Sequence, residues 1–543
     1  LSGEPVLAHD WMIVAANPHA ADAGAEVLRT GGTAADAMIA VQTVLGLVEP
    51  QSSGIGGGAF LIWYDGASGE ITTLDGRETA PKAVTPRHFQ TDDGVPIKFW
   101  DAVVGGKSVG VPGTPALMEM AHKKWGRKQW ASLFKQAIRL AEDGFPVSQR
   151  LAELVANDTA RLSRFFDTRA YFLPGGVPVA EGSRLFNHEY ANVMRQMAER
   201  GASVIYSGEI ADAIVKKVQT AENNPGVLSL ADLSGYEVKE RPALCSNFRQ
   251  YSVCGMGPPS SGALAIGQIL GMISQYPVGK PYDAQTLRLI GDASRLAFAD
   301  RGRYVADSDF VPVPMEGLIA EDYLSERASL LSRANALRDV EPGKPQFSHA
   351  LIWAEDKSLE FPSTSHISIV DVYGNALSMT TTIENAFGSR LMTHGFLLNN
   401  ELTDFSFKSH HNGVPVANRI QPGKRPRSSM SPTIVLQDNL PVLVIGSPGG
   451  SRIIGYVVQA IIAHLDWGMH IQEAVSMPHA VNRFGTYDLE QGTDLEGLLG
   501  PLQSLGYRVR TTALNSGLHA ISVEPNILRG GADPRREGIA IGK

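Results

Sequence analysis

The stretch from 366 to 382 constrains the fold more than any other part of the chain. Residues 366–371 alternate between apolar and polar side chains, and residues 376–382 form a second run with strand character. Between them, residues 372–375 read Val-Tyr-Gly-Asn, which is typical of a turn joining two antiparallel strands. The sequence therefore predicts a β-hairpin, and residues 363–365, Ser-Thr-Ser, stand directly before its first strand.

Helix signals surround this hairpin. Two alanine-rich segments, His19–Thr30 and Thr33–Leu47, have helical spacing, and Thr33 suits an N-cap. A second hairpin is predicted over 59–74, and amphipathic helices fill the block from 115 to about 218. Helices and antiparallel hairpins in one chain indicate an α+β protein with a large core.

Four polar segments lie outside these elements: Asp-Gly-Arg-Glu-Thr-Ala-Pro at 75–81, Gly-Phe-Leu-Leu-Asn-Asn-Glu-Leu-Thr-Asp-Phe-Ser at 395–406, Lys-Arg-Pro-Arg-Ser-Ser-Met-Ser-Pro-Thr at 424–433 and Gly-Ser-Pro-Gly-Gly-Ser-Arg at 446–452. Taken singly, each has an ordinary interpretation. Arg77 fits a surface arginine paired with Glu78. The glycine-rich segment fits a phosphate loop before a helix, although it lacks the lysine of a P-loop.

In their order along the chain, these segments and the hairpin resemble the γ-glutamyltranspeptidases, and Gly-Ala-Asp-Pro-Arg at 531–535 extends the resemblance over nearly the whole chain. The resemblance implies the N-terminal-nucleophile hydrolase fold, an α+β four-layer αββα sandwich. It also implies that the chain cuts itself between Ser363 and Thr364. The two products, 1–363 and 364–543, would then share one core as a heterodimer.

Thr364 would be the nucleophile by this resemblance. A threonine hydroxyl needs a base, and the new N-terminal amine, with a pKa of about 7.7–8.0, supplies one in the same residue. Thr382 matches a family threonine that orients the nucleophile. Gly449 and Gly450 match the family's oxyanion site, where backbone N–H groups stabilise the developing negative charge.

The resemblance also implies an acyl pocket. Arg77, Ser428 and Ser429 would bind the α-carboxylate of a γ-glutamyl group, because the planar fork of arginine suits a carboxylate. Glu401 and Asp404 would bind its α-amine. One sign of charge on each side fits a zwitterionic amino-acid head group.

Two features depart from the family pattern. Glu384 stands where well-known members have asparagine, so three carboxylates would gather with Glu401 and Asp404, which should raise at least one pKa. The segment 407–423 is shorter than the usual lid loop and holds no Tyr or Trp. Both departures fit relatives that hydrolyse glutaryl-type side chains from cephalosporins.

We therefore expect a self-processing hydrolase and transpeptidase that acts on γ-glutamyl amides such as glutathione, with water, an amino acid or a peptide as acceptor and no cofactor. One alternative is an acylase for glutaryl-type amides. The other is a homologue that never cleaves itself and serves as a binding protein.

Charge and composition limit the partners. The formal net charge is −8 and 19% of residues are charged, which gives no support to nucleic-acid binding. Apolar runs are too short to span a bilayer, and no Cys/His cluster has metal-ligand spacing. Because the chain begins at Leu1, we expect that a natural or artificial segment preceded it. The family suggests a periplasmic or secreted location, with a cytoplasmic one left open.

Two further expectations concern local structure. Cys245 and Cys254 flank a turn and would face each other across a hairpin, where we expect free, buried thiols rather than a disulfide. Residues 304–363 carry many charges and five prolines, which favours an exposed segment able to rearrange at the cleavage site.

Overall fold

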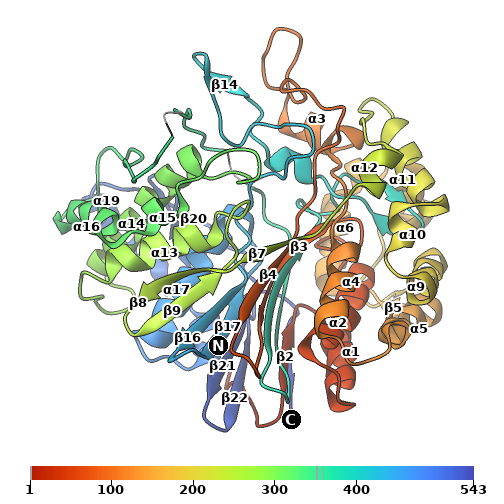
Figure 1. The fold of residues 1–543 in the computed structure, drawn as a ribbon, viewed down its shortest axis with the longest axis horizontal. Coiled ribbons are helices and arrows are strands. Elements are labelled where there is room, and N and C mark those ends of the chain that lie inside the picture. Colours follow the sequence, from red (N-terminus) through yellow and green to blue (C-terminus); the bar gives the residue numbers. More distant parts are fainter. Residues whose placement is uncertain (1–2, 350–351, 359) are drawn as a thin grey trace.

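The computed structural model describes residues 3–349, 352–358 and 360–543. Two seven-stranded sheets lie against each other, and helices cover both outer faces, so that the layers run helix, sheet, sheet, helix (Figure 1). This arrangement confirms the predicted α+β sandwich of four layers.

The first sheet is built around the predicted hairpin. Residues 365–370 and 376–382 pair as antiparallel neighbours, with Ser365 opposite Thr381. The first strand begins one residue earlier than predicted. In spatial order the strands of this sheet are β23 (Ile539–Gly542), β2 (Met12–Ala15), β10 (Ser365–Val370), β11 (Ala376–Thr382), β3 (Gly58–Tyr64), β4 (Ile71–Gly76) and β7 (Lys239–Pro242).

The second sheet joins strands that are distant in sequence. Its spatial order is β1 (Val6–Ala8), β22 (Ile527–Ala532), β21 (His519–Glu524), β17 (Leu440–Gly446), β16 (Thr433–Gln437), β9 (Tyr251–Gly255) and β8 (Leu244–Phe248). Smaller strands form separate pairs or a triplet: β5 (Phe145–Pro146), β6 (Arg184–Leu185), β12 (Met392–Thr393), β13 (Phe396–Leu397), β14 (His410–His411), β15 (Val414–Pro415), β18 (Ala480–Asn482), β19 (Thr486–Glu490) and β20 (Arg508–Thr512).

Alternation along each strand explains the layers. In β2, Ile13 and Ala15 pack against the helices of the outer layer, whereas Met12 and Val14 point to the core between the sheets. On the facing sheet, Ile434 belongs to this inter-sheet core. Successive side chains of a strand point to opposite faces of the sheet. A sheet whose strands carry apolar residues at both odd and even positions must therefore be covered on both sides.

Helices α1 and α2 cover the first sheet, and α13, α14 and α17 cover the second (Figure 1). The predicted N-cap of α2 is confirmed, since Thr33 and Asp36 form a reciprocal capping box. The helices are α1 (Pro18–Arg29), α2 (Ala34–Val48), α3 (Phe99–Val103), α4 (Thr114–Trp125), α5 (Lys135–Asp143), α6 (Gln149–Asn157), α7 (Thr159–Leu162), α8 (Phe166–Phe172), α9 (His188–Arg200), α10 (Ser203–Tyr206), α11 (Glu209–Gln219), α12 (Leu230–Ser234), α13 (Gly262–Ile273), α14 (Ala284–Tyr304), α15 (Met315–Ile319), α16 (Glu321–Ser329), α17 (Ile453–Leu465), α18 (Ile471–Ser476) and α19 (Leu499–Ser504).

Hydrogen bonds join the sheets beneath the hairpin. His366 Nδ1 lies 2.8 Å from the Thr380 hydroxyl, and its Nε2 lies 3.1 Å from the Ser368 hydroxyl. Ser368 and Ser378 donate to carbonyl oxygens of the second sheet. Burial holds the pKa of His366 well below its usual value, so the ring is neutral. These bonds fix the hairpin against the second sheet.

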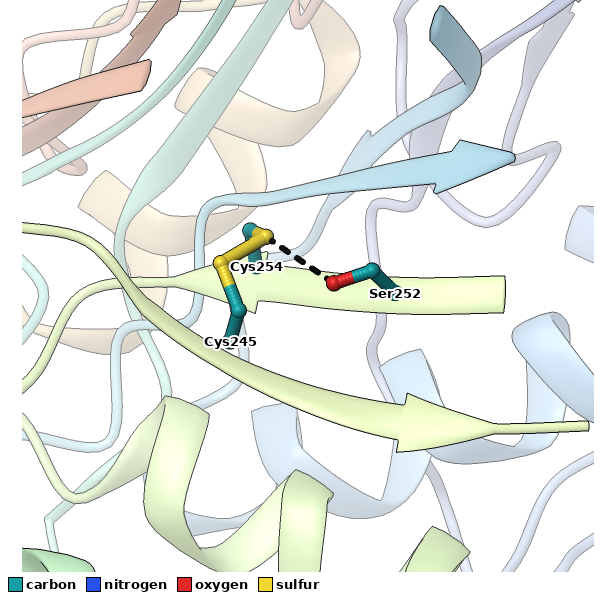
Figure 2. The surroundings of a disulfide bond; sticks show 3 residues. All are labelled: Cys245, Ser252 and Cys254. Carbon is teal, nitrogen blue, oxygen red and sulfur yellow. Dashed lines mark hydrogen bonds between the residues drawn. A yellow bond between two sulfur atoms is a disulfide. The ribbon is translucent and has the colours of Figure 1, made fainter. Parts of the chain in front are cut away.

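The two cysteines form a disulfide, so the expectation of free, buried thiols was wrong (Figure 2). Cys245 on β8 stands directly opposite Cys254 on β9, which brings their Cα atoms within 4.0 Å. Cys254 is buried in the inter-sheet core, whereas Cys245 is exposed at the surface. The strand register explains the bond, because directly opposed residues bring their sulfur atoms together.

Replacing both cysteines by serine should lower the free energy of unfolding by about 2–3 kcal/mol, because the bond restricts the unfolded chain. Calorimetry would show this as a lower melting temperature. Reduction of the wild-type protein should lower its melting temperature in the same way. Equal melting temperatures for the oxidised, reduced and substituted proteins would contradict this prediction.

Candidate active site

Thr364 and Thr382 meet at one end of the central hairpin. Thr364 directly precedes β10 and Thr382 ends β11, so the strand register places them opposite each other. Their hydroxyl oxygens lie 3.0 Å apart. The backbone N–H of Glu384 donates to the Thr382 hydroxyl oxygen at 2.9 Å. The Thr382 hydroxyl is thereby held beside that of Thr364, where it can orient a hydroxyl that acts as a nucleophile.

The peptide between Ser363 and Thr364 is buried, not exposed. Their exposed fractions are 1% and 4%. Ser363 donates to the carbonyl of Gln51, and Arg536 donates to the carbonyl of Thr364 at 2.8 Å. The expected exposed segment is therefore wrong at its C-terminal end; its residues 350, 351 and 359 lie outside the described residues.

Thr364 has a strained backbone. Its φ is +94°, a region that L-residues with a branched Cβ rarely adopt. Such conformations cost about 1–3 kcal/mol and persist where the surroundings impose them. Here the Ser363 hydroxyl and the Thr364 carbonyl are both anchored by hydrogen bonds, so the strain falls on the predicted cleavage site.

A cavity of about 20 Å³ opens beside the two threonines. Its wall contains every predicted site residue except Ser363 and Gly449. The lining residues are Arg77, Glu360, Phe361, Thr364, Thr382, Glu384, Glu401, Asp404, Ser428, Ser429, Met430, Gly450 and Ile453. The remaining space is about that of one water molecule, and Glu360 and Phe361, a few residues upstream of the predicted cut, form part of the wall.

The predicted oxyanion glycines differ in position. Gly450 begins the turn η6 (Gly450–Arg452), and a Cβ on it would lie 2.5 Å from the carbonyl oxygen of Glu360. Gly449, at a φ of +137°, packs against the ring of Tyr456. Only glycine can occupy either place, and the loop thereby approaches the chain just before Thr364.

Arg77 is fully buried and pairs with two acids. Its guanidinium forms ion pairs with Glu401 and, at 2.6 Å, with Asp404. Its Nε and Nη2 also donate to the backbone carbonyls of Pro426 and Arg427. The sequence predicted these three side chains at opposite ends of a substrate; in the uncut chain they contact one another.

Glu384 joins the same acidic group, as the sequence predicted. Burial, followed by repulsion from Asp404, raises its pKa well above the ordinary value. Burial also raises the pKa values of Glu401 and Asp404. Glu78 is a fourth acid; the ordinary interpretation of Arg77, a surface arginine paired with Glu78, is wrong, because both side chains are fully buried.

The profile of the gamma-glutamyltranspeptidase family matches residues 20–543. The chain belongs to the γ-glutamyltranspeptidase family. It is 36% identical to a glutathione hydrolase proenzyme of Bacillus subtilis (strain 168), over 98% of this chain and 91% of that protein. Identity to a glutathione hydrolase proenzyme of Escherichia coli (strain K12) is 33%, over 98% and 91%.

Solved structures place the chain in the same group. A cephalosporin acylase from Bacillus halodurans superposes with a TM-score of 0.87 at 25% identity, covering 100% of this chain and 97% of that one. A γ-glutamyltranspeptidase from Helicobacter pylori gives 0.60 at 31% identity, covering 64% and 98%. The family resemblance and the N-terminal-nucleophile hydrolase fold are thus confirmed, and the protein is a γ-glutamyltransferase-type amide hydrolase.

Residues 407–423, which the sequence matched to the family's lid loop, contain a small hairpin. Strands β14 and β15 pair through His411 and Val414, and the hairpin projects at the top of Figure 1.

Among the described residues, no helix combines the length and apolar character that a membrane crossing needs.

Some site residues escaped sequence reasoning. Arg301 lies in helix α14, whose sequence shows ordinary helical periodicity, and Arg536 lies near the C-terminus. Neither residue stands in a local sequence pattern that indicates a functional site. Glu360 had a weak one, since it is a charged residue three positions before the predicted cut. Their roles depend on tertiary contacts that a local pattern does not encode.

Glu78 gives a prediction about pH. Burial raises its pKa to about 7, whereas an unfolded glutamate has a pKa of about 4.3. The folded state therefore binds the proton more tightly, and stability is lost as pH rises through this interval. In a Thr364→Ala background, which should stay uncut, the free energy of unfolding should fall by on the order of 3 kcal/mol between pH 4.5 and 7.5. The additional substitution Glu78→Gln should abolish this fall, because glutamine does not titrate. Urea unfolding at both pH values measures it; parallel pH profiles for the two proteins would contradict it.

Proposed function

We propose that this protein is a self-processing hydrolase and transpeptidase of γ-glutamyl amides such as glutathione, and that Thr364 is its nucleophile. The observation that carries the proposal is the hydroxyl pair of Thr364 and Thr382 beside a pocket of one arginine and several carboxylates. The names of the glutathione hydrolase proenzymes to which the chain is similar support both the substrate and the processing.

Self-cleavage comes first in this scheme. The Thr364 hydroxyl attacks the carbonyl carbon of Ser363, the peptide C–N bond breaks, and the nitrogen takes up a proton as the new α-amine. The resulting ester is hydrolysed by water, which gives the chains 1–363 and 364–543. The strained backbone of Thr364 favours this step, because breaking the peptide bond removes the constraint on φ.

The mature enzyme then uses the freed amine of Thr364 as its base. The hydroxyl attacks the donor's acyl carbon, and the amide nitrogen leaves with a proton. Thr382 orients the nucleophile, and the backbone N–H groups of Gly449 and Gly450 stabilise the oxyanion. Water or an amine acceptor releases the acyl group and regenerates the hydroxyl.

Donor recognition is assigned to the acidic pocket. The α-carboxylate of the substrate would accept hydrogen bonds from Arg77, Ser428 and Ser429. Its ammonium group would donate hydrogen bonds to Glu384, Glu401 and Asp404. The entry of a substrate amine would offset the mutual repulsion of these acids, which favours a donor that carries an α-amine.

The second candidate is an acylase for glutaryl-type amides, favoured by the superposition with a cephalosporin acylase and by the short lid. A glutaryl group lacks the amine that these carboxylates would bind. The test compares kcat/KM for γ-glutamyl-p-nitroanilide and glutaryl-p-nitroanilide. The proposal expects the γ-glutamyl donor to be preferred by at least about tenfold; preference for the glutaryl donor would replace it with the acylase.

We also propose a periplasmic or secreted location. Its support is the bond between Cys245 and Cys254, since disulfides form and persist in oxidising compartments. Fractionation of the source cells, with thiol labelling of the recovered protein, tests it. Recovery of the protein in the cytosol with two free thiols would reject it.

A further inference from the structure

Phe361 lies at the mouth of the cavity beside Thr364. It is 43% exposed, whereas Arg77, Glu401 and Asp404 in the same wall are exposed by only 1%, 1% and 8%. Solvent therefore reaches the cavity on the side of Phe361, and the charged side chains form its closed end. A donor whose acyl group lies among these charges, with its amide carbon at Thr364, points its amine portion toward the mouth.

Helix α3 places an aromatic ring against Phe361 at this mouth. The ring of Phe99, the first residue of α3, lies 4.4 Å from the ring of Phe361 between centroids, with an interplanar angle of 30°. Trp100 meets Phe99 edge-on at 5.3 Å and is 38% exposed. The backbone N–H of Phe361 also donates to Glu384 at 3.2 Å. The surface that Phe361 covers is therefore aromatic on one side and borders the acidic pocket on the other.

Helix α3 is fixed relative to the acidic pocket. Ala102, on the same short helix as Phe99, is buried in a small apolar core with Leu402 and Phe405. Leu402 lies in the turn η5 (Glu401–Asp404), which carries two of the pocket acids. These contacts do not involve the segment that ends at the predicted cut. The position of Phe99 at the mouth is therefore set by the pocket itself.

Cleavage would change what covers the ring of Phe99. Phe361 lies two residues before the end of the proposed chain 1–363. While Glu360 and Phe361 form part of the wall, the cavity of about 20 Å³ is too small for a donor, so this end has to move before a substrate enters. The ring of Phe99 then loses its aromatic partner and faces water, which favours a ligand that brings a ring of its own.

We propose that Phe99 is a specificity-determining residue for the amine portion of the substrate, that it favours amines bearing an aromatic side chain such as that of phenylalanine, and that Phe361 fills this subsite before cleavage. The inference rests on the proposed function and concerns a part of the substrate that the acidic pocket does not contact. The subsite serves the leaving amine of the donor and the incoming amine of an acceptor alike, because both meet the acyl carbon at Thr364 from the mouth.

The test compares two donors with the same acyl group, γ-glutamylphenylalanine and γ-glutamylalanine. The wild type should hydrolyse the first with a kcat/KM at least about tenfold higher. Phe99→Ala should lower kcat/KM for γ-glutamylphenylalanine by about tenfold, mainly through KM, and for γ-glutamylalanine by less than about threefold. Phe99→Tyr keeps the ring face and should retain most of the preference. Phe166→Ala, which removes a 73% exposed ring outside the cavity wall, is the matched control.

A second measurement needs no variant that must fold and cut itself. The peptide Glu-Phe-Pro-Ser, copied from residues 360–363, should inhibit the mature wild-type enzyme at least about tenfold better than Glu-Ala-Pro-Ser. Equal inhibition by the two peptides would overturn the inference, and so would a loss in Phe99→Ala that is equal for both donors. Failure of the wild type to hydrolyse either γ-glutamyl donor would instead reject the proposed function.

Discussion

Replacement of Thr364 by alanine should leave the protein as one chain of about 58 kDa and abolish amide hydrolysis. The variant lacks the hydroxyl that attacks the Ser363 carbonyl, and it never gains the amine that serves as base. Intact-mass measurement of the denatured protein shows the first effect. Turnover of γ-glutamyl-p-nitroanilide shows the second, with a fall of at least about 10³-fold.

Matched variants separate the roles of the two hydroxyls. Thr364→Ser keeps the nucleophilic oxygen and should still cut, because only a methyl group is lost. Thr382→Ala keeps the nucleophile but removes its partner at 3.0 Å, and should cut more slowly. Two chains from Thr364→Ala, or a wild-type small chain that begins elsewhere than at Thr364, would reject the assigned nucleophile.

Arg77→Ala should be the most destabilising substitution in the pocket. It leaves Glu401 and Asp404 buried without their cation, and breaking such a pair costs about 3–5 kcal/mol. Urea unfolding in the uncut Thr364→Ala background measures this without interference from processing. In the mature enzyme the same change should reduce kcat/KM by at least about 10³-fold, because the acids lose their fixed positions.

Two comparisons test the cause. Arg77→Lys keeps the charge and should recover part of the stability, but its ammonium lacks the fork that spans two carboxylates. The loss of unfolding free energy caused by Arg77→Ala should also become smaller at acid pH. Without the arginine the pKa values of Glu401 and Asp404 rise further, and protonation removes the unpaired charge. A deficit that is unchanged between pH 5 and 8 would show that the ion pairs are not its source.

The local parts of this fold were predictable from sequence. The hairpin of β10 and β11 and the cap at Thr33 depend on residues a few positions apart, and both were found. That the polar segments of the sequence meet in one pocket was predictable only from their order along the chain, which resembles that of the family. Nothing local indicates that β10 pairs with β2, more than 350 positions away, or that β16 pairs with β9.

The misses share a physical cause. Cys245 and Cys254 were correctly placed on a hairpin, but the choice between thiols and a disulfide depends on a register that spacing alone does not fix. Glu360 was assigned to an exposed segment because charge normally indicates solvent. Its carboxylate instead meets a buried arginine from helix α14, a contact that only the folded chain reveals.

The strand order of the first sheet has a consequence for handling the mature enzyme. With the proposed cut, β23, β10 and β11 belong to one product and β2, β3, β4 and β7 to the other, and the two sets alternate across the sheet. Neither product can rebuild this sheet alone, and reassembly requires two chains to meet. After heating, the fraction of the cut form that regains activity should therefore depend on protein concentration. The uncut Thr364→Ala chain keeps a unimolecular route back to the native state, so its refolded fraction should not.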